Sequence, residues 1–384
     1  MRDERLEYLD NIRLLVIVLV VLMHAAVTYS GMGGWYFKEG AAVSIPEKLV
    51  FALGQSFTQS FFMGLLFLVA GYMVPRPLAR KGTRVFLTDR LVRLGGPALL
   101  YMLVVNPFIN YVLIGQAKLP FLSYLSSYYL TFKFLGGSGP LWFAIALLIF
   151  SAVYAGISSR MAAGVSEPTG GRGFGAGVVV KIILLITTAA FLIRLVQPID
   201  TSILNMQLCY FSSYIILFAV GIRAAEGRLL ERIEQRFACS CLLIALVPGV
   251  IFWGWMVYIS GALAGHSTAS FKGGLNWQSL LYAFWESATA VLMSVGLLGL
   301  FHARFNRQSI FFSKLSDSAF AVYAFHAPIL VAVSLALRGW QAAAWLKFLA
   351  VGGLALAVSF GLSHLFLKKL PLFQTRIPAK RVIT

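Results

Sequence analysis

Residues 9–24 read LDNIRLLVIVLVVLMH, and this stretch decides the fold of the chain. Its apolar run continues to Tyr29, so about 20 residues, at about 1.5 Å each along a helix, can cross a hydrocarbon core about 30 Å thick. We expect a transmembrane helix over 12–30. Acidic residues precede the run, and it lacks a clear small-residue cleavage site. Both features favour an uncleaved first span over a signal peptide.

The composition of the whole chain agrees with a membrane protein. The 384 residues are 59% hydrophobic, 14% aromatic and only 12% charged, and the mean hydropathy is +0.82. Soluble domains carry about 25% charged residues, so this chain lacks the polar surface of a water-soluble globule. The same figures exclude disordered, collagen-like and coiled-coil proteins. The expected fold class is all-α, a polytopic helical bundle in a lipid bilayer, built as a single domain over 1–384.

Apolar segments recur along the chain with short connections between them. We expect about ten transmembrane helices. They lie near 12–30, 56–74, 94–114, 140–158, 178–197, 206–222, 238–259, 279–301, 318–337 and 343–367. One longer connection, 159–177, is rich in glycine and is expected to be flexible. The aromatic stretch 116–139 is expected at a membrane interface.

The basic residues predict how the helices are oriented. The net charge is +18, with 32 Lys and Arg against 14 Asp and Glu. When the N-terminus is placed inside, 24 of these 32 basic residues lie on the inner side, and every inner connection is more basic than its outer neighbours. The positive-inside rule then predicts two cytoplasmic termini in a multi-pass protein of the cell membrane. The charge indicates contact with anionic lipid rather than with nucleic acid.

Two ionisable residues share one face of the first span. Arg13 and His24 are eleven residues apart, which places them within about 20° of each other around a helix and roughly 16 Å apart along it. Arg13 then lies at the cytoplasmic mouth and His24 near the middle of the membrane. Asp10, three residues before Arg13, can reach it. Because ionisable groups at depth are costly, a functional stripe is favoured over a snorkelling arginine and a structural histidine.

Two later spans carry further ionisable residues. His326 is expected at a depth similar to that of His24, and the nearby Pro328 frees a backbone carbonyl that its imidazole could bond. Glu286 lies well inside its span, where an isolated carboxylate should be protonated or paired. For both residues a structural role and a site role are open.

The most basic connection, 75–93, precedes the third span. Arg90 and Arg93 are three residues apart, share a helix face and enter the span, whereas the other basic residues of this connection are expected to face anionic lipid. Arginine forks onto phosphate oxygens, so Arg90 and Arg93 are candidate anion-binding residues beside Arg13. The three cysteines of the chain lack zinc spacing, and neither a disulfide framework nor a metal site is expected.

Several blocks of sequence form a recognisable series. The first is LDNIR at 9–13, followed after ten residues by His24. The others are FFMG at 61–64 with AGYMV at 70–74, RLVRL at 90–94, GPLWF at 139–143 and AVYAFHAP at 321–328. Taken together, they resemble acyltransferase family 3, the integral membrane O-acyltransferases that include O-antigen acetylases and the glucan biosynthesis succinyltransferase, protein C. The resemblance covers nearly the whole chain.

The resemblance implies a donor on the cytoplasmic side. That donor is acyl-CoA, acting as a substrate with an acetyl or succinyl group, and no bound cofactor or metal is implied. Its phosphates carry several negative charges, and Arg13, Arg90 and Arg93 are apt to bind them. Asp10 would then orient Arg13.

The resemblance also implies an acceptor, which is a hydroxyl of a glycan or related molecule presented from the outer side. His24 would act as the general base on this hydroxyl, or alternatively as a nucleophile that carries the acyl group. Trp142, Glu286 and His326 are expected to orient groups or to line the tunnel. The acyl group, the acceptor and the oligomeric state stay open.

Two other classes of function compete with this one. Ten spans with buried ionisable residues would also suit a proton-coupled transporter or flippase. The concentration of polar residues on one stripe, and the lack of paired broken helices in two halves, speak against a carrier. A scaffold without activity would leave the Arg13 and His24 stripe unexplained.

Overall fold

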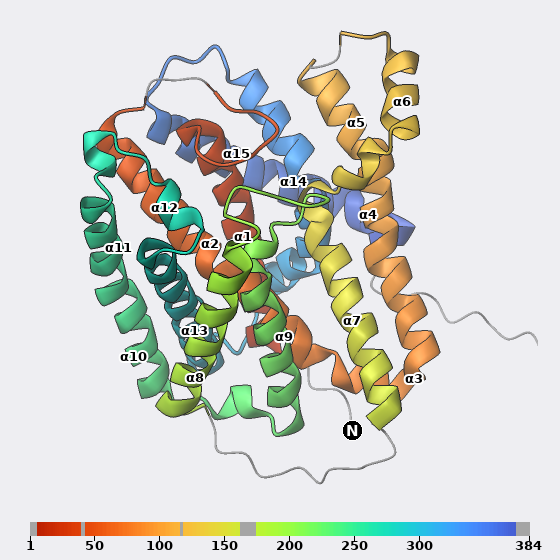
Figure 1. Cartoon of the computed structure of the whole chain (residues 1–384). Helices are drawn as coiled ribbons and strands as arrows, with labels where there is room; N and C mark the ends of the chain where they lie inside the picture. Colours follow the sequence, from red (N-terminus) through yellow and green to blue (C-terminus); the bar gives the residue numbers. More distant parts are fainter. Residues whose placement is uncertain (1–5, 40–42, 116–117, 162–173, 374–384) are drawn as a thin grey trace, which may run out of the picture.

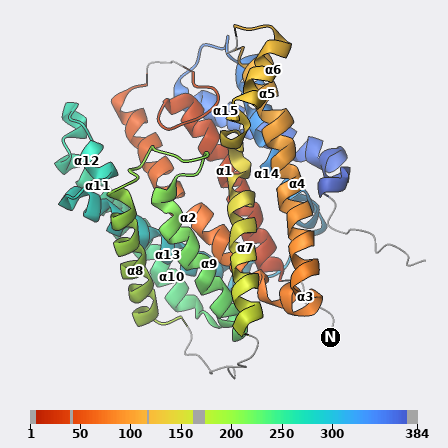
Figure 2. The ribbon, with the colours of Figure 1, turned by 45° about the vertical axis from the view of Figure 1, so that its right-hand side comes forward.

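A computed structural model of the protein describes residues 6–39, 43–115, 118–161 and 174–373. These residues form helices and connecting loops, with an isolated bridge between Ile203 and Met206 and no strand. Ten of the described helices are long and apolar enough to cross a membrane, which confirms the expected all-α fold class. Figures 1 and 2 show these helices gathered into one bundle.

The spanning helices follow one another along the chain. They are α1 (Glu7–Ser30), α2 (Ile45–Met73), a long third span from Pro75 to Leu113 that includes α3 (Pro75–Arg90), α4 (Gly96–Leu100) and α5 (Asn106–Phe108), α7 (Trp142–Met161), α8 (Ala176–Arg194), α9 (Phe211–Glu226), α10 (Gln235–Leu246) with α11 (Pro248–Ile259), α13 (Trp277–Arg304), α14 (Ile310–Ala336) and α15 (Ala344–Leu365). Two shorter helices, α6 (Phe121–Leu130) and α12 (Ala269–Lys272), lie in the connections.

Three span starts differ from the sequence prediction by more than five residues. Helix α14 begins at Ile310 rather than near residue 318. Helix α2 begins at Ile45 rather than near residue 56, because Ser44 and Glu47 form a capping box that starts the helix earlier. The basic connection 75–93 is helical and continuous with the third span, apart from Gly82, whose φ of 72° breaks the helix. Of the glycine-rich connection 159–177, residues 162–173 lie outside the described part of the chain.

Helix α1 lies inside the bundle. It contacts α2, α13, α14 and α15, and most of its residues from Tyr8 to Ser30 are buried. A helix surrounded in this way holds its polar side chains against protein rather than lipid. The position of α1 therefore explains how ionisable groups can be accommodated within a membrane-spanning helix.

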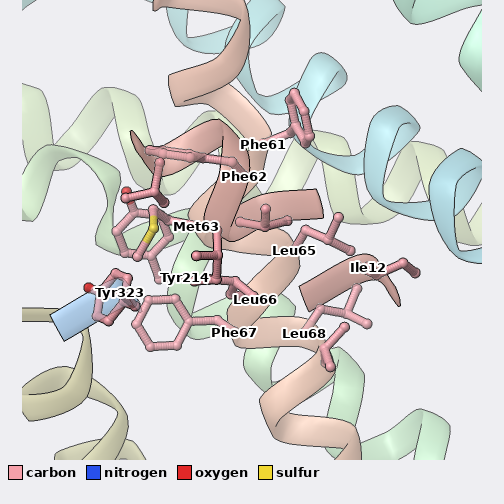
Figure 3. Close-up of a cluster of buried hydrophobic side chains, with 14 of the residues drawn as sticks. Ile12, Phe61, Phe62, Met63, Leu65, Leu66, Phe67, Leu68, Tyr214 and Tyr323 are labelled. Atoms are coloured by element: carbon pink, nitrogen blue, oxygen red, sulfur yellow. The ribbon is translucent and has the colours of Figure 1, made fainter. Parts of the chain in front are cut away.

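The closest helix crossing joins α2 and α9 and supports the core beside α1. A Cβ added to Gly71 would lie 2.1 Å from the carbonyl oxygen of Phe218, and one added to Gly221 would lie 2.1 Å from that of Leu68. Small residues let two membrane helices approach this closely. Figure 3 shows the apolar side chains of α2 that pack next to this crossing, including Phe67, near Tyr214 and Tyr323. This packed layer lies beneath the candidate site.

Candidate active site

A large cavity lies at the end of the bundle where α1 ends and α2 begins. Its volume is about 1180 Å³. The walls include residues of helices α1, α2, α5, α7, α9, α11, α12, α13 and α14 and of the loops 31–39, 195–207 and 260–268. Aromatic and amide side chains recur among the lining residues, which include Tyr36, Gln59, Asn106, Trp142, Asn205, Tyr210 and Tyr282. A mixed lining of rings and a few polar groups is typical of a small-molecule site.

His24 lines this cavity and contacts a second histidine. Its Nδ1 lies 3.1 Å from Nε2 of His326, which is buried in α14. The residues are 302 positions apart in sequence, and the contact between α1 and α14 brings them together. The two histidines, which the sequence analysis expected at similar depths, therefore lie in direct contact.

The partners of His326 determine which nitrogen of His24 carries the proton. The Nδ1 of His326 lies 2.7 Å from the backbone carbonyl oxygen of Tyr323, and a carbonyl can only accept, so this Nδ1 donates. In the neutral ring Nε2 of His326 is then an acceptor, and Nδ1 of His24 must donate to it. The remaining nitrogen of His24, Nε2, therefore carries a lone pair.

Trp35 stacks on one face of the His24 ring. The two rings stack with centroids 3.8 Å apart and planes 23° apart. Trp35 belongs to the loop that follows α1, and its indole nitrogen is buried without a partner in the described part of the chain. Trp35 on one face of the ring and His326 at its Nδ1 thus restrict the orientation of the His24 imidazole.

Hydrogen bonds fix the loop that carries Trp35. The hydroxyl of Tyr36 donates to Oδ1 of Asn106 at 2.7 Å, and the backbone N–H of Glu39 donates to the Thr28 carbonyl at 3.0 Å. The Glu39 carboxylate pairs with Lys347 of α15. Burial raises the pKa of the Tyr36 phenol above its ordinary value, so the hydroxyl keeps its proton. The sequence prediction did not include Trp35 and Tyr36. Two aromatic residues shortly after a span that contains Arg13 and His24 could have pointed to them.

The three arginines of the predicted donor site lie together at the opposite end of α1. Arg13 contacts Asp10, with 3.3 Å between Nη1 and Oδ1, and its side chain is 43% exposed. Arg90 lies close enough to Arg13 and Arg93 for their positive charges to act on it. Arg93 lies on the π-helical turn Leu91–Gly95, a distortion that is frequent at functional sites.

The cavity does not extend to these arginines. None of Arg13, Arg90 and Arg93 lines it, and the intervening turns of α1 carry the buried Val16 and Ile17. The cavity of His24 therefore ends before the arginines, and the turns of α1 between them carry buried apolar side chains.

Of the other predicted residues, Trp142 lies at the cavity and Glu286 lies away from it. Trp142 lines the cavity and stacks on Tyr214, with centroids 5.6 Å apart. Glu286 does not line it. It forms an ion pair with Arg194, the last residue of α8, which is fully buried. The expected pairing of a carboxylate at this depth is present, and its partner is a residue that the sequence prediction did not single out.

Because Arg194 is fully buried, we expect Glu286→Ala to lower the free energy of unfolding by about 3 kcal/mol or more, since an uncompensated buried charge remains. The double variant Arg194→Met with Glu286→Leu should recover much of this loss, because it removes both charges together. Thermal unfolding of the purified protein in nanodiscs measures both. Equal stability of Glu286→Ala and wild type would contradict a structural role for the pair.

The described residues contain no group of three or more His, Cys, Asp or Glu side chains that could hold a metal ion. All three cysteines are free thiols, Cys209 and Cys241 buried and Cys239 exposed. What the site offers instead is one imidazole with a directed lone pair, a covering indole and a cavity large enough for a substrate. Such a group can act as a general base or as a nucleophile.

Ten apolar helices around a histidine-centred cavity define the class of the protein, which is a multi-pass membrane protein. The particular family follows from a comparison with family models. The model described as "Acyltransferase domain" matches residues 6–364, and the chain therefore belongs to acyltransferase family 3, a family of membrane acyltransferases. The chain matches no curated protein and no solved structure.

Proposed function

We propose that the protein is an O-acyltransferase of the cell membrane that moves an acetyl or succinyl group from cytoplasmic acyl-CoA to a hydroxyl of a glycan or related acceptor at the outer face. One observation carries this proposal. The unprotonated Nε2 of His24 belongs to a residue that lines the large cavity, while Arg13 of the same helix lies at the opposite end with Arg90 and Arg93. This separation of a base from a cluster of arginines supports a reaction across the membrane.

The chemistry needs one base and no further reactant. As the acceptor oxygen bonds to the thioester carbonyl carbon, the hydroxyl proton moves to Nε2 of His24. The carbon–sulfur bond then breaks, and the leaving CoA thiolate takes the proton back from the imidazolium. In the alternative route Nε2 first forms a bond to the carbonyl carbon as the carbon–sulfur bond breaks and the thiolate leaves. The acceptor oxygen then displaces the imidazole from the carbonyl carbon, and the hydroxyl proton goes to the thiolate.

The cavity suits a glycan acceptor. Its aromatic side chains offer flat apolar faces, and amide groups such as those of Gln59, Asn106 and Asn205 offer donors and acceptors for hydroxyls. The cavity lies at the end of α1 that the distribution of basic residues predicts to be outside. The donor would reach the cavity from the arginines, past the turns of α1 that carry Val16 and Ile17.

We expect Arg13→Ala to weaken acyl-CoA binding by about tenfold or more, because a charge-assisted hydrogen bond contributes about 1.5–3 kcal/mol. Arg13→Lys should lose less affinity, since lysine keeps the positive charge and loses only the paired hydrogen bonds of the guanidinium. Titration with acetyl-CoA and succinyl-CoA measures the dissociation constants. Arg223→Ala is a suitable control, because Arg223 is an exposed residue of α9 paired with Glu226. Unchanged affinity in Arg13→Ala would remove this residue from the donor site.

The proposed function is tested by incubating purified protein with radiolabelled acetyl-CoA or succinyl-CoA and a crude glycan fraction. Label that appears in the glycan, and only with one of the two donors, would support acyl transfer and identify the acyl group. Folded protein that neither binds nor consumes acyl-CoA would overturn the assignment and favour a carrier.

A further inference from the structure

A second hollow lies on the bundle between α1, α2 and α15. Its volume is about 550 Å³, and its lining is almost entirely apolar. From α1 it includes Leu19 and Leu22, from α2 Val50 and Phe51, and from α15 Phe348. We call this hollow the α1–α2–α15 groove. Its helices are membrane-spanning and several of its residues are exposed, so the groove faces the hydrocarbon of the bilayer.

The groove adjoins the cavity of His24. Met23 and Gln55 line both hollows, and Met23 is the residue directly before His24. Gln55 donates to the Ser30 hydroxyl at 2.8 Å, so the shared wall contains a polar contact as well as a thioether. A molecule that filled both hollows would have its polar part beside His24 and its apolar part in the bilayer.

The groove begins at the same end of the bundle as the cavity. Pro46 and Glu47 from the first turn of α2 and Trp345 from the first turn of α15 line it, and it extends along α2 to Thr58. At about 1.5 Å per residue this stretch of α2 is roughly 18 Å long. One leaflet contributes about 15 Å of the hydrocarbon core, so the stretch is slightly longer than one leaflet is deep. The groove thus runs from the acceptor end of the protein into the membrane, and the arginines of the donor site lie at the opposite end.

We propose that the α1–α2–α15 groove binds the hydrocarbon tail of a lipid-linked acceptor whose sugar head occupies the cavity of His24. This inference rests on the proposed function for the role of the head group. A tail that begins at the outer face and runs inward fits an acceptor lipid of the outer leaflet. The acyl tail of a donor would come from the arginine end, where this groove does not open.

Gly54 allows the groove to be blocked without disturbing the fold. It lines the groove, and a Cβ added to it would meet no atom within 4 Å. Gly54→Leu therefore fills the hollow and also improves helix propensity. Gly254 of α11 is the matched control, because it is also helical and exposed, has open space at its Cβ position and lies outside the groove.

The experiment uses dodecyl glucoside with a diazirine in its alkyl chain, photolysed with the full-length protein in nanodiscs. Labelled peptides are mapped by mass spectrometry. We expect label on α1 and α2 at the groove in wild type and in Gly254→Leu, and at least about tenfold less in Gly54→Leu. The loss of only two buried methylene groups already accounts for a factor of about ten in affinity. Excess unlabelled dodecyl glucoside should suppress the label.

Three results would overturn the proposal. Equal labelling of the groove in Gly54→Leu and wild type would show that no tail binds there. Suppression by palmitoyl-CoA, and not by dodecyl glucoside, would assign the groove to the acyl tail of a donor. Suppression by dodecanol as strong as that by the glucoside would show that any apolar chain enters. The labelling requires no acyl transfer, so failure of the transfer assay is a separate result that concerns the reaction alone.

Discussion

His24→Ala is expected to lower the rate of acyl transfer by about 10²–10⁴, because a positioned general base contributes about that factor. The side chain lines the cavity, and its Nε2 is the nitrogen that carries the lone pair. Donor binding should be retained, since Arg13 and its neighbours lie at the other end of α1. The loss should therefore fall on the turnover number and not on the dissociation constant of acyl-CoA.

Single-turnover transfer from radiolabelled acyl-CoA, together with donor titration, measures both quantities. His364→Ala is a matched control, because His364 lies near the opposite end of α15 and contacts Lys368. Covalent label on wild-type protein that is absent from His24→Ala would identify the acyl-imidazole route. Wild-type turnover in the His24→Ala variant would exclude this histidine from either route.

Much of the fold follows from the sequence because the hydrocarbon thickness dictates the length of each apolar segment. The number of spans is confirmed for this reason. The predicted start of α2 was wrong because the charged residues Glu47 and Lys48 lower the hydropathy of its first turn, although the capping box at Ser44 was present in the sequence. The helical connection 75–93 was missed because basic residues indicate position relative to the membrane and not backbone conformation.

The candidate site was predictable only where it lies on one helix. The shared face of Arg13 and His24 follows from helical periodicity alone. The contact between His24 and His326 joins α1 to α14, and a single sequence contains no signal for a pairing at such a separation. The burial of Arg194 was unexpected for the same reason, since its partner Glu286 lies 92 residues away in α13. Long-range pairing therefore had to come from the structure.

The role of His326 leads to the last prediction. If His326 directs the proton of His24 to Nδ1, then His326→Leu should lower the turnover number by about 10² or more, because the loss of an acceptor lets His24 adopt the unproductive tautomer. His326→Gln should retain more activity, since its side-chain oxygen can lie near the former Nε2 and accept the same hydrogen bond.

Comparison of these two variants separates positioning from packing. Both change the buried volume beside His24, but only glutamine restores an acceptor. The measurement is the turnover number with saturating acyl-CoA, accompanied by the donor dissociation constant, which neither variant should change. Equal turnover in the leucine and glutamine variants would show that His326 supports the site only by filling space. A higher turnover number in the glutamine variant would show that the hydrogen bond from His24 to residue 326 keeps Nε2 unprotonated and ready to receive the acceptor proton.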